Sequence, residues 1–310
     1  MKLTIELLNK HYLVNTSFSW SLAIPVSFNQ SERQPNHFGA SPASSTPMLA
    51  GEFIGDTKQG GSCNVNELNI NPHCNGTHTE TVAHICDLET YAKPYIRQSK
   101  ASDGVSKKNI TNTYITNSEL SLTIAQISLP PLMPCALVSI TPEHGLTSND
   151  NYTPALLEND FIISRQRLEN ALEAFDNAQL QCVVIRTLPN NINKCQQRYS
   201  EHDQPAFFSR DAIDYLNERG VEHIVVDLPS LDRLFDDGLL TCHHIFWQVS
   251  EGAHQANANS LINKTITELA FISNDIADGF YFISLQTPAF INDAAPSRPI
   301  LYSAQLIENK

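Results

Sequence analysis

The second half of the chain alternates helix-like and strand-like patterns, and this alternation limits the possible folds more than any other feature. Ser164 and Ser209 each precede apolar residues at helical spacing, which predicts two helices with serine N-caps. Residues 183–185 lie between these helices, and residues 221–226 follow Gly220; both are short apolar runs typical of buried strands. Strand, helix and strand with short connections predict an α/β domain.

Other segments are less regular. Alternating apolar and polar residues predict a strand over 120–127, and apolar runs predict further strands over 136–140, 280–285 and 300–306. Residues 29–66 are rich in Ser, Pro, Gly and Asn and lack periodicity, so we expect mostly irregular structure there. A connection of that length is usually either disordered or a functional loop that covers a site.

Composition excludes several classes of protein. The 310 residues include 33 acidic and 20 basic side chains, and the net charge of −13 argues against a nucleic-acid partner. No run of 18 apolar residues predicts a membrane span, and the N-terminal residues lack a secretory apolar region. Seven cysteines without a C-x-x-C pair favour a reducing compartment, so we expect a cytoplasmic protein.

Residues 71–84 contain a cluster of candidate metal ligands. Borderline metals such as Zn²⁺ and Mn²⁺ bind imidazole and carboxylate groups. If residues 78–80 are extended, His78 and Glu80 share one face, because strand side chains repeat every two residues. A tight turn at Asn75-Gly76 could return His73 to the same point, which leaves open positions for water. The candidate groups in this segment are His73, Cys74, His78, Glu80 and His84.

The same segment resembles a family motif. Pro72-His73, Gly76-Thr77-His78, Glu80 and His84 are similar to the H-x-G-T-H-x-D-x-P-x-x-x-H pattern of the cyclase family, which includes bacterial kynurenine formamidase and isatin hydrolase. Residues 212–232 resemble the helix, turn, strand and D-x-x-S-x-D segment of that family. Residues 242–246 resemble its HHxLL element and residues 266–269 its I-x-E-N-L element. The matches follow the family order from about residue 71 to 285.

Some positions depart from the family pattern. His73 lies five residues before His78 where the family has four, and the position four before is Cys74, which leaves a thiolate ligand as an alternative. Glu80 replaces the family's aspartate, and the proline before His84 is missing. Residues 250–260 look inserted. These departures indicate a divergent branch of the family.

The resemblance implies a fold, an assembly and a site. The expected fold is α/β, with mixed sheets and flanking helices of the swivelling β/β/α type, as one domain over residues 1–310 that assembles into a homodimer or homotetramer. His73, His78 and Glu80 would bind a first metal ion, and His84 would be the catalytic histidine. His244 and Glu268 would complete a second metal position, and Glu80 would bridge the two ions. His243 is the alternative to His244.

The function that the resemblance implies is hydrolysis of a non-peptide amide C–N bond with one or two Zn²⁺ or Mn²⁺ ions. The expected reaction is that of an arylformamidase, which converts N-formylkynurenine to kynurenine and formate in tryptophan catabolism. His84 could transfer the proton. Two alternatives stay open: ring opening of a cyclic amide or lactone, and a non-catalytic relative that binds a metal or small molecule. An aromatic amide substrate could contact Phe18, Trp20, Phe38 and Trp247.

Overall fold

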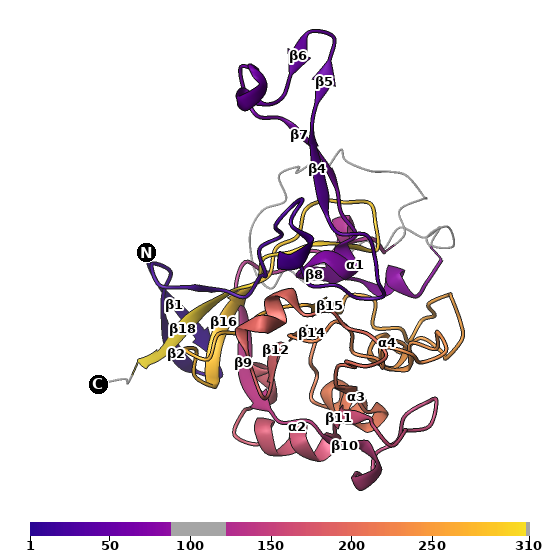
Figure 1. Cartoon of the computed structure of the whole chain (residues 1–310). Helices are drawn as coiled ribbons and strands as arrows, with labels where there is room; N and C mark the ends of the chain where they lie inside the picture. The colour runs from indigo at the N-terminus through magenta and orange to yellow at the C-terminus, as the bar shows by residue number, and fades with distance from the viewer. Residues whose placement is uncertain (88–121, 308–310) are drawn as a thin grey trace.

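A large mixed sheet forms the centre of the molecule (Figure 1). The computed structural model describes residues 1–87 and 122–307. The sheet order is β1-β2-β18-β16-β9-β12-β14-β15-β8-β17, with β3 beside β18. Its strands are β1 (Lys2–Leu7), β2 (Lys10–Asn15), β3 (Trp20–Ser21), β8 (His78–Glu80), β9 (Met133–Ile140), β12 (Cys182–Thr187), β14 (His223–Val226), β15 (Thr265–Glu268), β16 (Gly279–Ser284), β17 (Ala294–Pro296) and β18 (Ile300–Ile307).

Smaller elements surround this sheet. Three short strands form a second sheet, and two ribbons, β4 with β7 and β5 with β6, lie in the N-terminal part. The helices are α1 (Pro72–Asn75), α2 (Arg165–Leu172), α3 (Arg210–Glu218) and α4 (Thr241–Trp247). The short strands are β4 (Ser44–Pro47), β5 (Leu49–Ala50), β6 (Phe53–Ile54), β7 (Asn66–Asn69), β10 (Glu143–His144), β11 (Phe161–Ile163) and β13 (Phe207–Phe208).

The four neighbouring strands β9, β12, β14 and β15 run parallel and lie between two apolar layers. Along β12, Val183 and Ile185 pack in the core with α2, α3 and α4, whereas Val184 faces a second core with Leu22 and Met133. Every residue of β12 is buried, because a parallel sheet covered on both faces exposes neither side of its strands. The prediction of an α/β fold with mixed sheets and flanking helices is confirmed.

The predicted helices have the expected caps. The Ser164 side chain accepts a hydrogen bond from the Arg167 N–H at the start of α2, and Ser209 accepts one from the Ala212 N–H at the start of α3. The chain leaves α3 through Gly220, whose φ of +75° suits a residue without Cβ. Each serine satisfies one of the amides that a helix N-terminus leaves unpaired. The strands expected over 136–140, 183–185, 221–226, 280–285 and 300–306 correspond to β9, β12, β14, β16 and β18.

The strand expected over residues 120–127 is wrong in its described part. Residues 120 and 121 lie outside the described residues, and Ile124–Gln126 form one turn of 3₁₀ helix. The Thr123 N–H donates to the Gln126 side chain, and the Gln126 N–H donates to the Thr123 carbonyl. The Ile124 N–H donates to the carbonyl of Asn292. These bonds satisfy the backbone of the turn without a neighbouring strand, although the apolar alternation is that of a strand.

The segment 29–66 contains more regular structure than its composition predicts. Its C-terminal part forms β4 to β7, an arm that projects away from the large sheet (Figure 1). Its N-terminal part is a compact loop held by Gln34, whose side chain donates to the carbonyls of Ser27 and Ala43 and accepts from the Ala43 N–H. The strand pairs of the arm and the hydrogen bonds of the buried Gln34 side chain therefore order this segment, although its sequence has no periodic apolar pattern. Among the described residues, no helix has the length and apolar character needed to cross a membrane.

Candidate metal centre

The centre begins at α1 and β8. The Asn71 side chain accepts a hydrogen bond from the His73 N–H, and Pro72 occupies the first turn of α1, where no N–H is needed. At Gly76 the backbone passes close to Val26, whose Cγ2 would lie 3.0 Å from a Cβ at this position. A larger residue at this position would therefore require the Val26 side chain to shift by a few tenths of an ångström.

Strand pairing brings distant residues to β8. This strand lies between β15 and β17 near one edge of the sheet, and His78 is directly opposite Glu268 of β15. Directly opposite side chains in an antiparallel pair lie on the same face. The His78 Nε2 is 3.3 Å from a carboxylate oxygen of Glu268.

Glu80 lies at the middle of the cluster. One of its oxygens is 3.2 Å from the His73 Nδ1 and 3.8 Å from the His84 Nε2, and the other is 3.0 Å from the His243 Nε2. The His84 side chain is 25% exposed, so it lies between the buried carboxylate and solvent. Two sets of donor atoms that could each hold one cation share Glu80: His73 with His78, and His84 with His243.

Helix α4 contributes His243, and His244 lies outside the cluster. The His243 Nε2 is also 3.6 Å from Glu268, whereas the His244 Nδ1 donates to the Val249 carbonyl at 3.3 Å. Successive side chains on a helix point about 100° apart, so the two neighbours cannot face the same centre. The choice of His244 over His243 is corrected by this geometry.

Asp232 and Asp293 complete the cluster, and the sequence interpretation assigned no role to either. The Asp232 Oδ2 lies 2.5 Å from the His243 Nδ1. The Asp293 Oδ2, just before β17, lies 2.8 Å from the His73 Nε2 and 3.2 Å from the His84 Nδ1. Asp232 falls in the recognised D-x-x-S-x-D segment, which is a usable signal. Asp293 belongs to no motif that we singled out.

Cys74 does not join these groups. It is buried, and burial together with the charge of Glu268 raises the pKa of its thiol to about 11. In the absence of a metal ion, such a thiol is protonated at neutral pH. Within the described part of the chain, none of the candidate sets of metal donors contains Cys74.

The predicted aromatic contacts are scattered. The Trp247 ring lies 5.7 Å from that of His243, whereas Trp20 packs against Tyr281 in another part of the molecule. Phe18 is exposed, and Phe38 lies against His37. These four residues therefore do not form one aromatic pocket.

The carboxylates and imidazoles of the cluster shift one another's pKa values. Burial acts to raise the pKa of Glu80, but His84 and His243 hold this pKa well below its usual value. Burial acts to lower the pKa of His73, but Asp293 and Glu80 raise it to about 10. The protonated imidazoles thus supply positive charge that a divalent cation could replace.

The polar atoms of the cluster fit a metal ion. Ten buried side-chain atoms of the described residues have no hydrogen-bond partner with suitable geometry, and four of them belong to this cluster: the Nε2 atoms of His78 and His243 and both carboxylate oxygens of Glu80. Buried polar atoms without partners are costly, and imidazole and carboxylate are common ligands of Zn²⁺ and Mn²⁺. This donor set can therefore accept one or two such ions.

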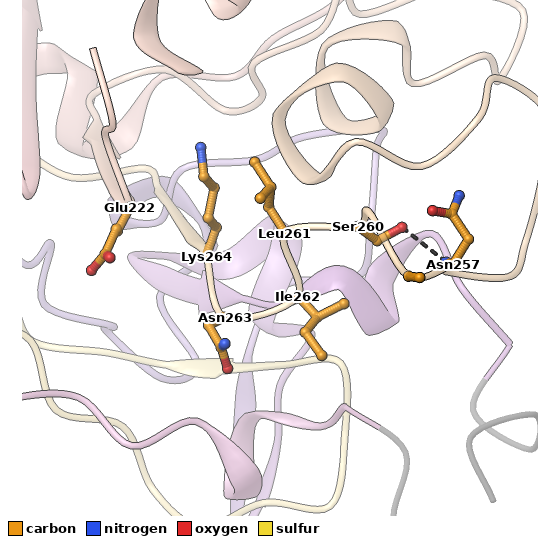
Figure 2. A pocket seen from close by; sticks show the side chains of 8 residues that line it. Glu222, Asn257, Ser260, Leu261, Ile262, Asn263 and Lys264 are labelled. Carbon is orange, nitrogen blue, oxygen red and sulfur yellow. Dashed lines mark hydrogen bonds between the residues drawn. The ribbon is translucent and has the colours of Figure 1, made fainter. Parts of the chain in front are cut away.

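A separate cavity of about 430 Å³ lies near the start of β15 (Figure 2). Its lining includes Glu222, Leu261 and Lys264 but none of the cluster residues. Burial lowers the pKa of Lys264 to about 8, and its ammonium group lies over the Phe246 ring. The candidate centre, at the other end of β15, is a different site.

The fold and the cluster together define an α/β protein with a buried histidine–carboxylate centre near the edge of a mixed sheet. Residues 2–233 match the family described as putative cyclase, and the chain belongs to this cyclase family. The family predicted from the motifs is therefore confirmed. None of the curated proteins matches the chain in sequence.

Several solved structures share the fold. A predicted metal-dependent hydrolase from Bacillus stearothermophilus is 15% identical, with a TM-score of 0.50 over 92% of this chain and 98% of that chain. A structure described as a novel cyclase is 16% identical, with a TM-score of 0.54 over 93% of this chain and 89% of that chain. Isatin hydrolase A from Ralstonia solanacearum is 12% identical, with a TM-score of 0.51 over 92% of this chain and 91% of that chain. At these identities the likeness shows the fold alone.

Proposed function

We propose that this protein is a metal-dependent hydrolase that cleaves a non-peptide amide C–N bond. The observation that carries the proposal is the convergence of buried nitrogen and oxygen atoms of His78, His243 and Glu80 that have no hydrogen bond of suitable geometry among the described residues. A divalent cation, Zn²⁺ or Mn²⁺, would satisfy them. The residues that would hold one or two ions are His73, His78, Glu80, His243 and Glu268.

The mechanism follows from the positions of the side chains. A divalent ion held by these residues would supply a Lewis acid for the scissile carbonyl and would lower the pKa of a water molecule. His84, at the exposed side of the cluster, takes a proton from the attacking water and returns it to the leaving nitrogen. Asp293 faces the His84 Nδ1, so it fixes the ring with Nε2 directed toward Glu80. The products are a carboxylic acid and an amine.

The substrate class follows the family resemblance. We propose an aromatic amide, with N-formylkynurenine as the first compound to test. Ring opening of a cyclic amide is the second candidate, supported by the isatin hydrolase that shares the fold. A homodimer or homotetramer stays a prediction.

Metal content and turnover test the proposal together. The protein is stripped with a chelator, reloaded with Zn²⁺ or Mn²⁺, analysed for metal and assayed with N-formylkynurenine and isatin. We expect bound metal and hydrolysis only in the reloaded protein, loss of both in Glu80→Gln, and no change in Glu67→Gln, whose side chain lies on the exposed strand β7. Metal binding without hydrolysis of either compound would instead favour a non-catalytic binding protein, and absence of metal would contradict the whole site.

A further inference from the structure

Asp293 lies beside the two histidines on the solvent side of the cluster. Its Oδ2 is 2.8 Å from the His73 Nε2 and 3.2 Å from the His84 Nδ1. The side chains of Asp293 and His73 are 24% exposed and that of His84 is 25% exposed, whereas the Glu80 side chain is fully buried. The cluster therefore has a second carboxylate, which solvent reaches.

The two imidazole rings lie between these carboxylates. The rings of His73 and His84 are stacked, with centroids 4.4 Å apart and an interplanar angle of 28°. Each ring directs one nitrogen toward Glu80 and the other toward Asp293. The stacked pair thus presents one set of nitrogens to the buried side of the cluster and a separate set to the solvent side.

The atoms on the solvent side have the spacing of metal donors. One ligand atom from each of His73, His84 and Asp293 lies within 4.8 Å of the other two. In a tetrahedral zinc site with bonds of about 2.1 Å, neighbouring donors are about 3.4 Å apart. The measured separations of 2.8 and 3.2 Å are close to this value. An ion between these atoms therefore needs only small shifts of the side chains.

An ion on the solvent side shares His73 with the buried donors. A neutral imidazole has a free lone pair on only one nitrogen, so His73 can bind one ion at a time. While its Nδ1 serves an ion beside Glu80, the outer ion is held by His84 and Asp293, and water fills the remaining positions. Fewer protein donors make the outer site weaker than the buried one, so an excess of metal is needed to fill it.

We propose that His84 and Asp293, with His73 as a third donor, form a second cation site on the solvent side, and that excess Zn²⁺ or Mn²⁺ bound there stops the reaction. A neutral imidazole whose Nδ1 binds an ion carries its proton on Nε2 and cannot accept a second one from water. His84 is then lost as a proton acceptor, although the buried donors keep their ions. The inhibition rests on the proposed function, whereas the binding site does not.

Metal titration measures the site without a substrate. The full chain is loaded with Zn²⁺, passed through gel filtration to remove free metal, and titrated with Zn²⁺ by calorimetry. We expect the wild type to bind one further ion per chain. His84→Ala and Asp293→Asn should each bind this ion about 10- to 100-fold more weakly, because each lacks one donor.

Glu6→Gln is the matched control for this titration. Glu6 is another exposed carboxylate beside an exposed histidine, 3.9 Å from the His11 Nε2. This pair offers two donors at a longer separation and lies away from the cluster, on β1 and β2. Glu6→Gln should therefore bind the further ion as the wild type does.

Several results of the titration would overturn the proposal. They are the absence of a further ion in the wild type, wild-type affinity in either His84→Ala or Asp293→Asn, and equal weakening in Glu6→Gln. Elemental analysis of the gel-filtered proteins counts the buried ions, which should be equal in the wild type and His84→Ala. Loss of these ions in His84→Ala would place His84 in the buried site and would also overturn the proposal.

Inhibition is measured as the rate of N-formylkynurenine or isatin hydrolysis against added Zn²⁺. We expect the wild-type rate to fall over the same concentration range in which the further ion binds. Relative to its own rate without added metal, Asp293→Asn should need about 10- to 100-fold more Zn²⁺ for the same inhibition. Glu6→Gln should match the wild type. Wild-type inhibition in Asp293→Asn would place the inhibitory ion elsewhere and overturn the proposal.

Failure of the hydrolase and failure of the cation site give different results. A further ion that His84→Ala and Asp293→Asn both lose, in a protein that hydrolyses neither compound, would contradict the hydrolase and support the cation site. Hydrolysis that added Zn²⁺ leaves unchanged, in a protein that binds no further ion, would do the opposite.

Discussion

The Asp232 carboxylate holds the His243 imidazole through a contact of 2.5 Å between Oδ2 and Nδ1, with both side chains only 1% exposed. The same carboxylate accepts from the backbone N–H groups of Cys242 and His243, so it also fixes the start of α4. With Nδ1 bound to Asp232, the His243 Nε2 is left to face Glu80. Histidines that bind metals are commonly oriented by a carboxylate in this way.

Asp232→Asn should weaken metal binding by about 10- to 100-fold, because the amide cannot hold His243 as the carboxylate does. Chelator competition measures the affinity. Tyr152→Phe is the control, since the Tyr152 hydroxyl donates to the other Asp232 oxygen, 2.8 Å away, and its loss leaves the His243 contact in place. Equal affinity in wild type and Asp232→Asn would show that His243 is no ligand or needs no support.

His84→Ala should keep the metal content but lower kcat by about 10²- to 10⁴-fold, the usual effect of removing a general acid–base group. The His84 ring is at the exposed side of the cluster, 3.8 Å from Glu80, so its removal leaves the buried donors intact. Elemental analysis and single-turnover rates separate the two effects. Loss of metal in this variant would make His84 a ligand.

Cys74→Ser should leave metal affinity nearly unchanged, whereas His73→Ala should reduce it strongly. The His73 Nδ1 lies 3.2 Å from the central carboxylate, whereas the Cys74 thiol belongs to none of the candidate donor sets among the described residues. Metal titrations of both variants decide between the two neighbours. The reverse result would move the ligand by one residue along α1.

Acid should destabilise the fold partly through His223. Burial lowers its pKa from 6.5 to about 4 in the folded protein, so the unfolded chain binds the proton more readily. The contribution of this residue is fully present above pH 6.5 and is lost progressively as the pH falls toward 4. At pH 5 the loss is on the order of 2 kcal/mol.

Urea unfolding at pH 7.5 and pH 5 tests this acid sensitivity. His223→Gln carries no titrating group, so its free energy of unfolding should fall less between the two pH values than that of the wild type, by about the same 2 kcal/mol. The same fall in both proteins would contradict the buried neutral histidine.

Much of the candidate site could be predicted from local spacing. His78 and Glu80 are two residues apart on an extended segment, which places them on one face wherever that segment lies. The position of His73 beside this pair could be predicted from the turn that ends α1. Glu268 could be proposed only through the family order of motifs, because its position opposite His78 depends on strand pairing.

Other features could not be found in this way. His243 and His244 are equivalent in composition and spacing, and only the packing of α4 determines which ring faces Glu80. Asp293 lies in a loop without periodicity, and its contacts with His73 and His84, far away along the chain, position it. The apolar alternation of residues 120–127 predicted a strand, but hydrogen bonds to residues 290 and 292 hold the described part of this segment as a turn.

The sequence by itself determined the elements that depend on neighbouring residues: the serine-capped helices α2 and α3, the buried strands β12 and β14, and the histidine–carboxylate pair on β8. The order of its motifs also identified the cyclase family. Only the tertiary structure decided which side chains meet at the centre, because Glu80, Asp232, His243, Glu268 and Asp293 come from segments that strand pairing and helix packing bring together. Short-range periodicity specifies the face on which a side chain lies, whereas the atom that it faces depends on contacts between distant parts of the chain.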